Sequence, residues 1–177
     1  MPNSSILPWI LLAALPACAE VEPSAVDGGA WRPLIDAAMW EETPTARDPL
    51  AEHRATTVPC DHDAWRVEGA GLEVETTSCG YLSLDQPLVE QVLAGDLVRV
   101  NVWWQTLASE APALGHLAVL IDGEVVWEEH VDIPGEADAR LVEVRAERDF
   151  APGATITFHL HNHGYNTWNL GAIEVSR

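Results

Sequence analysis

The chain has 177 residues, a length typical of one domain or of one domain with a tether, which argues against separate cofactor and substrate domains. Its net charge of -19, with all nine basic side chains arginine and no basic stripe, would repel a phosphate backbone. Nucleic acid is therefore excluded as a partner. A hydrophobic content of 47% and a charged content of 21% are ordinary for a globular protein, so the acidity indicates a solvated surface.

An apolar run, Ile6 to Leu15, lies close to the start of the chain. It is too short to span a bilayer and fits the apolar core of a secretory signal peptide. The sequence Leu15-Pro16-Ala17-Cys18 follows, and it resembles the lipobox of bacterial lipoproteins. The resemblance implies a signal peptide over residues 1–17 and a lipid on Cys18 that anchors the protein in a membrane of the cell envelope, at the outer membrane or cell surface. A secreted protein is the alternative.

Residues 18–58 have the composition of a spacer, because prolines and acidic residues are scattered through them without sustained alternation. Within this segment Trp31 to Trp40 would form at most one short helix, which would dock on the domain through Leu34, Ile35 and Met39. We therefore expect a tether that carries the following domain, residues 59–177, away from the membrane.

The chain contains three cysteines. If Cys18 carries lipid, Cys60 and Cys79 remain as a pair, and an even remainder favours a disulfide in an oxidising compartment. Two buried thiols, or two metal ligands, are the alternatives.

Beyond Cys60 the pattern changes to short apolar alternations separated by Gly, Pro and Asp, which is typical of antiparallel strands. The predicted strands are 70–76, 80–84, 97–105, 116–121, 124–133, 140–147, 154–162 and 168–175. Asp122-Gly123 predicts a two-residue hairpin turn between two of them. Eight strands in a region of this length predict an all-β, eight-stranded antiparallel sandwich.

Residues 60–177 resemble a jelly-roll β-sandwich of the galactose-binding-domain type, the architecture shared by many carbohydrate-binding modules. The resemblance rests on the rhythm of the strands and on the closing run from Gly153 to Gly164 with the Asn166-Thr167-Trp168 that follows it. It implies that the seventh strand lies between the second and the fourth, with the fifth beyond, and that a carbohydrate or another envelope component is the partner. This fold hosts unrelated functions, so the ligand must be argued from the site.

Histidines alternate with apolar residues in the strand 154–162, which places His159 and His161 on the face turned away from the core. With the jelly-roll pairing, the same alternation adds further polar residues to that face: Tyr81, Ser83, His116, Glu128, His130 and Asp132. One hypothesis is a zinc or copper site formed by His159, His161, His116 and His163. The alternatives are a solvent-facing polar row and a ligand-binding face without metal.

Aromatic residues suggest a second binding surface. Trp104 is expected in the core together with Trp127, whereas Trp103 shares the opposite face with amide and guanidinium groups suited to stacking on a sugar ring and binding its hydroxyls. The residues of this surface are Arg99, Asn101, Trp103 and Gln105, and a second candidate rim at the closing turn contains Tyr165, Asn166 and Trp168.

Catalytic motifs are missing from the sequence: there is no Gly-x-Ser-x-Gly elbow, no phosphate loop and no His-Glu-x-x-His. The function we expect is therefore a membrane-anchored, non-enzymatic envelope lipoprotein that binds a carbohydrate or another envelope ligand and needs no cofactor. The alternatives are a zinc- or copper-binding sandwich, or metalloenzyme, that uses the histidine face, and a structural envelope protein without a small ligand.

Overall fold

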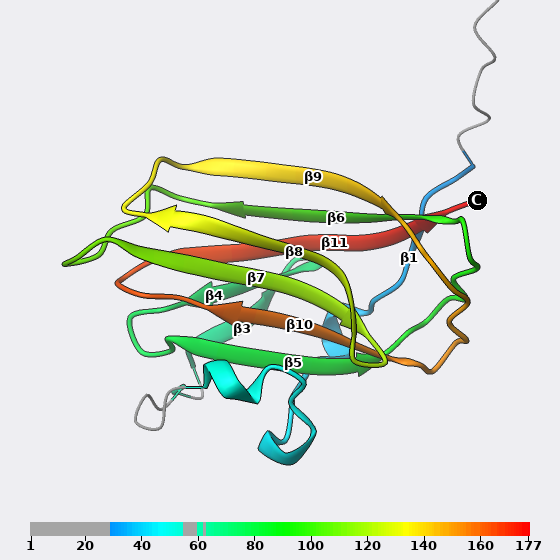
Figure 1. The fold of residues 1–177 in the computed structure, drawn as a ribbon, viewed down its shortest axis with the longest axis horizontal. Coiled ribbons are helices and arrows are strands. Elements are labelled where there is room, and N and C mark those ends of the chain that lie inside the picture. Colours follow the sequence, from blue (N-terminus) through cyan, green and yellow to red (C-terminus); the bar gives the residue numbers. More distant parts are fainter. Residues whose placement is uncertain (1–28, 55–59, 62) are drawn as a thin grey trace, which may run out of the picture.

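The computed structural model describes residues 29–54, 60–61 and 63–177, and over them the chain forms two antiparallel sheets packed face to face (Figure 1). We call the first of these sheet A. It runs in the order β3-β4-β11-β6-β9, with β1 beside β11. Its strands are β1 (Arg32–Pro33), β3 (Trp65–Glu68), β4 (Gly71–Glu75), β6 (Leu97–Trp104), β9 (Asp138–Arg145) and β11 (Thr167–Ser176).

The second sheet, sheet B, runs in the order β2-β5-β10-β7-β8. Its strands are β2 (Glu41–Glu42), β5 (Tyr81–Pro87), β7 (Ala113–Ile121), β8 (Glu124–Ile133) and β10 (Thr155–His161). The observed order places the predicted seventh strand, β10, between the second and the fourth, β5 and β7, with β8 beyond. The predicted all-β sandwich and its jelly-roll pairing are therefore confirmed.

Each of the eight predicted strands is present, within a few residues of its predicted bounds, and the structure adds three more in the residues that it describes: β1, β2 and β3. The hairpin turn between β7 and β8 is also confirmed. Asp122 and Gly123 have φ angles of 51° and 78°, the left-handed values that a two-residue turn of this type requires at both positions. The Asp122 carboxylate also accepts a hydrogen bond from the Thr155 backbone N–H at 2.9 Å.

The hydrophobic core lies between the sheets and is filled by the alternate residues that face inward. Trp104 and Trp168, paired across β6 and β11, are both buried there with ring centroids 5.2 Å apart. The Trp168 indole N–H donates to the Asn162 side-chain oxygen at 2.9 Å, so its polar atom is satisfied. Trp127 is buried as predicted.

The prediction of a flexible spacer is wrong for its described part, residues 29–54. Strands β1 and β2 pair with β11 and β5, and Leu34 and Trp40 belong to the core. The remaining structure consists of short 3-10 turns: η1 (Ala37–Met39), η2 (Thr45–Arg47) and η3 (Ala51–His53). Strands of two residues are too short to produce a visible alternation, which explains why the sequence pattern missed them.

The docked helix predicted over Trp31 to Trp40 is replaced by β1 and the turn η1. Leu34 and Ile35 are buried as expected, whereas Met39 is 41% exposed. The predicted signal peptide and Cys18 lie outside the described residues. In 29–54, 60–61 and 63–177, no helix has the length and apolar character needed to cross a membrane.

The predicted disulfide between Cys60 and Cys79 is present, with Cα atoms 4.0 Å apart. Cys79 is buried in the connection between β4 and β5. The disulfide therefore links Cys60, which follows the 29–54 segment, to the residues just before β5. Strand β5 is the one with which β2 of that segment pairs.

Candidate functional site

The outer face of sheet B carries the histidines that the sequence singled out. In the observed register His159 lies opposite Ser83 and Ala118, and His161 lies opposite Tyr81 and His116. His116 in turn lies opposite His130 on β8, and their rings are stacked with centroids 4.3 Å apart. The strand pairing therefore confirms the prediction that these residues lie on one face.

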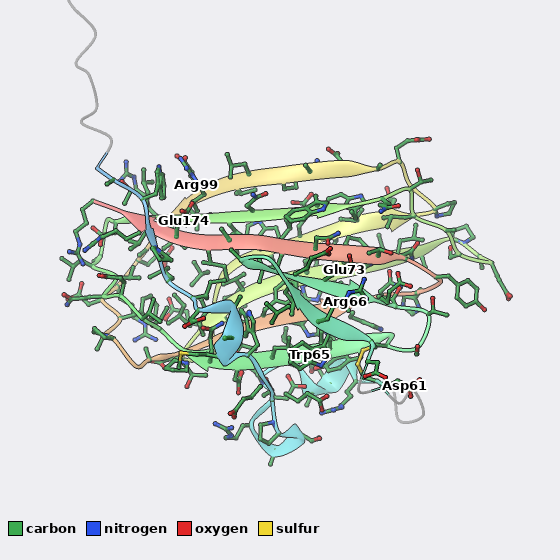
Figure 2. The ribbon with its side chains drawn as sticks, turned by 180° about the vertical axis from the view of Figure 1, so that it is seen from behind. Asp61, Trp65, Arg66, Glu73, Arg99 and Glu174 are labelled. Carbon is green, nitrogen blue, oxygen red and sulfur yellow. A yellow bond between two sulfur atoms is a disulfide. The ribbon has the colours of Figure 1, made fainter. Side chains whose placement is uncertain are left out.

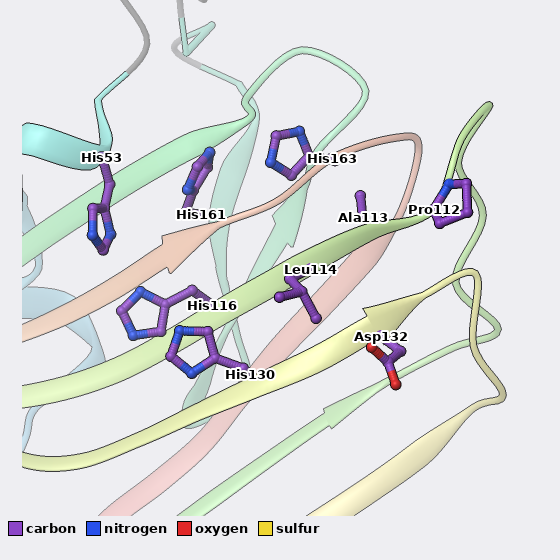
Figure 3. Close-up of a pocket in the computed structure, with 9 residues that line it drawn as sticks. All are labelled: His53, Pro112, Ala113, Leu114, His116, His130, Asp132, His161 and His163. Carbon is purple, nitrogen blue, oxygen red and sulfur yellow. The ribbon is translucent and has the colours of Figure 1, made fainter.

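Residues 43–54, here called the cover segment, pass over this face. Thr43 continues the pairing with β5 by donating its backbone N–H to the Ser83 carbonyl at 2.9 Å. Further along, the Asp48 carboxylate accepts a hydrogen bond from the Tyr81 hydroxyl. At the end of the cover segment His53 projects from η3 toward the imidazoles on β7 and β10 (Figure 3).

The expectation of a solvent-facing row is therefore wrong where the cover segment lies. His159 has no exposed surface and His116 is 5% exposed, although both point away from the core between the sheets. Leu120, on the same face, is only 1% exposed. Alternation places these side chains on the outer face of sheet B. The cover segment, which the sequence pattern did not connect with that face, passes over it.

His53, His116 and His159 form the centre of the cluster. One ring nitrogen of each lies within 4.8 Å of the others. The ring centroid of His53 is 5.3 Å from that of His116 and 5.9 Å from that of His159. The same residues also supply four buried ring nitrogens without a hydrogen bond of ordinary geometry: Nδ1 of His53, Nδ1 of His116, and both nitrogens of His159.

Buried polar atoms normally have a partner, because leaving one unsatisfied costs about 1–3 kcal/mol. Four such atoms lie on adjacent imidazoles, although the His159 ring also interacts with the Leu82 backbone. A cation bound by one nitrogen of each ring would satisfy three of them. His116 shows how the rings are oriented, since its Nε2 lies 3.2 Å from a Glu128 carboxylate oxygen. If that nitrogen carries the proton, the lone pair of Nδ1 is free to bind a cation, and the carboxylate fixes the ring as outer-shell partners of metal-binding histidines do.

Burial also favours the neutral form of three imidazoles on this face, those of His116, His159 and His161. Burial, followed by the neighbouring His116, His53 and His161, lowers the pKa of His159 to about 3. Burial and His130 lower the pKa of His116 against the opposing effect of Glu128. Burial and His163 likewise lower the pKa of His161. Neutral imidazole is the form that binds metal ions.

A pocket of about 600 Å³ opens beside the cluster (Figure 3). His53 and His116 form part of its wall, and His159 does not. The other lining residues come from the ends of β7, β8 and β10: Pro112, Ala113, Leu114, His130, Asp132, His161 and His163. The three-histidine cluster is thus reached from outside through its two less buried members.

The structure brings together only part of the predicted set of metal ligands. His116 and His159 belong to the cluster, as predicted. His161 lies beside it, with its ring centroid 6.1 Å from that of His53, and His163 lies 4.8 Å beyond His161. Sequence reasoning missed His53, because that residue lies in a segment interpreted as spacer and nothing in the local pattern connects it with the strands.

The outer face of sheet A carries the predicted aromatic surface. Trp103 is 39% exposed, and the edge of its ring lies over Gly171, where an added Cβ would come within 2.6 Å of it. Arg99, expected beside it, is engaged elsewhere: it pairs with Glu143 at 2.6 Å and stacks on Trp31 at 3.5 Å. Figure 2 shows this side of the molecule, with Arg99 beside Glu174 near one end of the sheet.

The second candidate rim does not exist as a surface, because two of its three residues are buried. Trp168 has no exposed surface, and Asn166 uses its side chain inside the protein, where its oxygen accepts from the Ala108 backbone N–H at 2.6 Å. Tyr165 alone is exposed. β11 begins at Thr167, one residue before the predicted start, and Trp168 alternates with Asn169 and shares the core face with Leu170.

Comparisons with solved structures return carbohydrate-binding modules. A family 4 module is 11% identical over 64% of this chain and 75% of its own, with a TM-score of 0.41. A family 61 module in complex with β-1,4-galactotriose is 12% identical over 82% and 99%, with a TM-score of 0.42. A xylan-binding family 22 domain from Paenibacillus barcinonensis is 14% identical over 86% and 97%, with a TM-score of 0.36.

No protein-family model and no curated protein matches the chain. The solved structures are β-sandwich modules of low similarity to this chain, and the fold described above rests on its own strand pairing. Its function must be argued from its own residues.

Proposed function

We propose that this protein is a cell-envelope β-sandwich that binds a transition-metal ion, zinc or copper, through His53, His116 and His159. The observation that supports it is that each of these three residues brings one ring nitrogen within 4.8 Å of the others, and that each has a buried ring nitrogen without a hydrogen bond of ordinary geometry. The lipobox-like sequence at Cys18 supports anchoring of the domain at a membrane surface, as expected from the sequence.

Imidazole nitrogens are the donors that zinc and copper favour. With metal–nitrogen distances of about 2.1 Å, tetrahedral zinc places its ligand nitrogens about 3.4 Å apart. The three nitrogens lie within 4.8 Å of one another, so the rings must draw together slightly. His116 and His159 are held by strands, whereas His53 lies on a short turn, and we expect His53 to make most of this movement.

Electrostatics favour a cation as the guest. The chain carries a net charge of -19, which concentrates cations near its surface, and Glu128 lies against one of the proposed ligands. The structure therefore attracts a cation at long range and offers neutral donors at short range.

The test is metal binding by the mature, chelator-treated protein, measured by isothermal titration and by elemental analysis after dialysis. We expect one equivalent of zinc or copper per chain. His53→Ala should weaken binding by about 100-fold or more, because it removes a ligand, and losing an outer-shell partner alone costs 10–100-fold. His53 lies on a surface turn, so this variant should fold.

His163→Ala is the matched control, since it removes an imidazole from the same pocket but outside the cluster. It should bind metal within about threefold of the unaltered protein. Absence of stoichiometric binding, or equal losses in the two variants, would show that the cluster is not a metal site.

Carbohydrate binding on the outer face of sheet A is a second candidate, favoured by one observation: Trp103 lies on the sheet beside Gly171 and Asn101 and stays 39% exposed. A flat ring with amides beside it suits a sugar. Glycan-array binding that is lost in Trp103→Ala and kept in His53→Ala would support this candidate, and an array without binding would contradict it.

A further inference from the structure

We propose that the metal ion keeps one coordination position open toward the pocket, and that this position binds a small carboxylate carrying a short apolar group. This inference rests on the proposed metal site at His53, His116 and His159. It names a class of ligand for that site, and no sequence motif indicated this class.

The open position follows from the number and placement of the donors. Among the residues that the structure describes, the cluster contains three donors, and zinc sites with three protein ligands keep a fourth position for water or another ligand. His53 and His116 line the pocket while His159 is buried behind them. An ion held by all three would therefore face the pocket with its remaining position.

The charge at this position favours an anion. The three imidazoles are uncharged donors, and Glu128, which contacts His116, supplies one negative charge beside them, so a divalent cation would keep part of its charge uncompensated. His130 and His161 lie beside the cluster and can donate N–H groups to a carboxylate. Asp132, the carboxylate in the pocket wall, lies at the opposite end of the pocket from His53 (Figure 3).

The rest of the pocket favours an apolar group on the same ligand. Pro112, Ala113 and Leu114 form one wall, and the Leu114 side chain is 51% exposed. A carboxylate on the ion would place a short substituent against this wall and remove part of the leucine from water. Pockets that bind small molecules combine apolar walls with a few polar groups in this way.

The experiment uses the mature chain loaded with cobalt(II), whose visible spectrum reports its coordination. Benzoate, acetate and benzyl alcohol are titrated separately. We expect benzoate and acetate to change the spectrum saturably, with benzoate binding about tenfold more tightly, and benzyl alcohol to change nothing. Leu114→Ser should reduce the advantage of benzoate over acetate to about twofold.

Leu141→Ser is the matched control, because it changes an exposed leucine on the other sheet, and it should leave all three titrations unchanged. A chain that takes up no cobalt would overturn the metal site itself. A chain that binds cobalt but shows no response to either carboxylate has closed coordination, for instance through His161, and would overturn the present inference alone. Equal binding of benzoate and acetate would overturn the apolar part of the proposed ligand.

Discussion

The outer faces of the two sheets follow the same alternation and have different environments. On sheet A, Leu141 is 62% exposed and Trp103 is 39% exposed. On sheet B, the outward-facing Leu120 and His159 are 1% and 0% exposed, and the cover segment passes over this face, where His53 contacts the ring of His159. Alternation therefore decides which side of a sheet a residue faces, whereas burial on that side depends on what the rest of the chain lays across it.

Matched leucine substitutions on the two faces provide the most direct test of this difference. Leu120→Ala removes a buried side chain under the cover segment and should cost about 3 kcal/mol of unfolding free energy, within the usual 2–5 kcal/mol for buried leucines. Leu141→Ala changes an exposed leucine and should cost less than about 0.5 kcal/mol. Urea denaturation measures both, and similar losses would mean that sheet B is not covered in solution.

The disulfide should contribute almost as much. Cys60 and Cys79 are 19 residues apart, and closing a loop of this size restricts the unfolded chain by about 3 kcal/mol. The Cys60→Ser/Cys79→Ser double variant should therefore unfold at a lower temperature, as measured by calorimetry. Reductant should lower the melting temperature of the unaltered protein and leave that of the double variant unchanged; a bridge without effect would show no difference between them.

The histidine face should make the metal-free protein sensitive to acid. The pKa of His159 is lowered to about 3 in the folded protein, against about 6.5 in the unfolded chain, so between these values unfolding takes up a proton. The contribution of His159 to the free energy of unfolding is fully present above pH 6.5 and decreases as the pH is lowered. By pH 5 this one group should reduce the free energy of unfolding by about 2 kcal/mol. Urea denaturation with chelator across pH 4.5–7.5 measures the slope.

His159→Asn should reduce this slope, since it removes the group with the large pKa shift, while His116 and His161, whose pKa values are also lowered, keep a smaller slope. His163→Ala leaves the buried cluster intact and should keep the slope. A slope unchanged in His159→Asn would mean that His159 remains accessible to protons in the folded state.

The smallest effect concerns the attachment of the cover segment. Tyr81→Phe removes the hydroxyl that donates to Asp48, whose side chain is fully buried, and leaves the Leu50 backbone N–H as a donor to that carboxylate. We expect a loss of about 1–2 kcal/mol. Tyr165→Phe alters an exposed tyrosine and should have no measurable effect, so equal stability of both variants would refute the anchoring role of Tyr81.

Much of the fold was predictable because it depends on local pattern. Alternation in Thr155–His161 and the Asp122-Gly123 turn specify strands and their connection through short-range sterics alone. The two cysteines were paired correctly because few combinations exist. The buried state of Trp168 was missed, because this residue was assigned to the rim of the closing turn although it lies in the predicted strand 168–175, where it shares a face with the apolar Leu170.

The amino-acid sequence by itself determined the sandwich, the disulfide and the placement of His116, His159 and His161 on one face. Only the tertiary structure decided that the face is covered and that His53 joins it. His53 is separated from His116 by 63 positions and from His159 by 106, by subtraction of their numbers, and no periodicity spans such distances. The contact arises because β2 pairs with the edge of sheet B and directs the following residues across it, a long-range packing event that leaves no local signal.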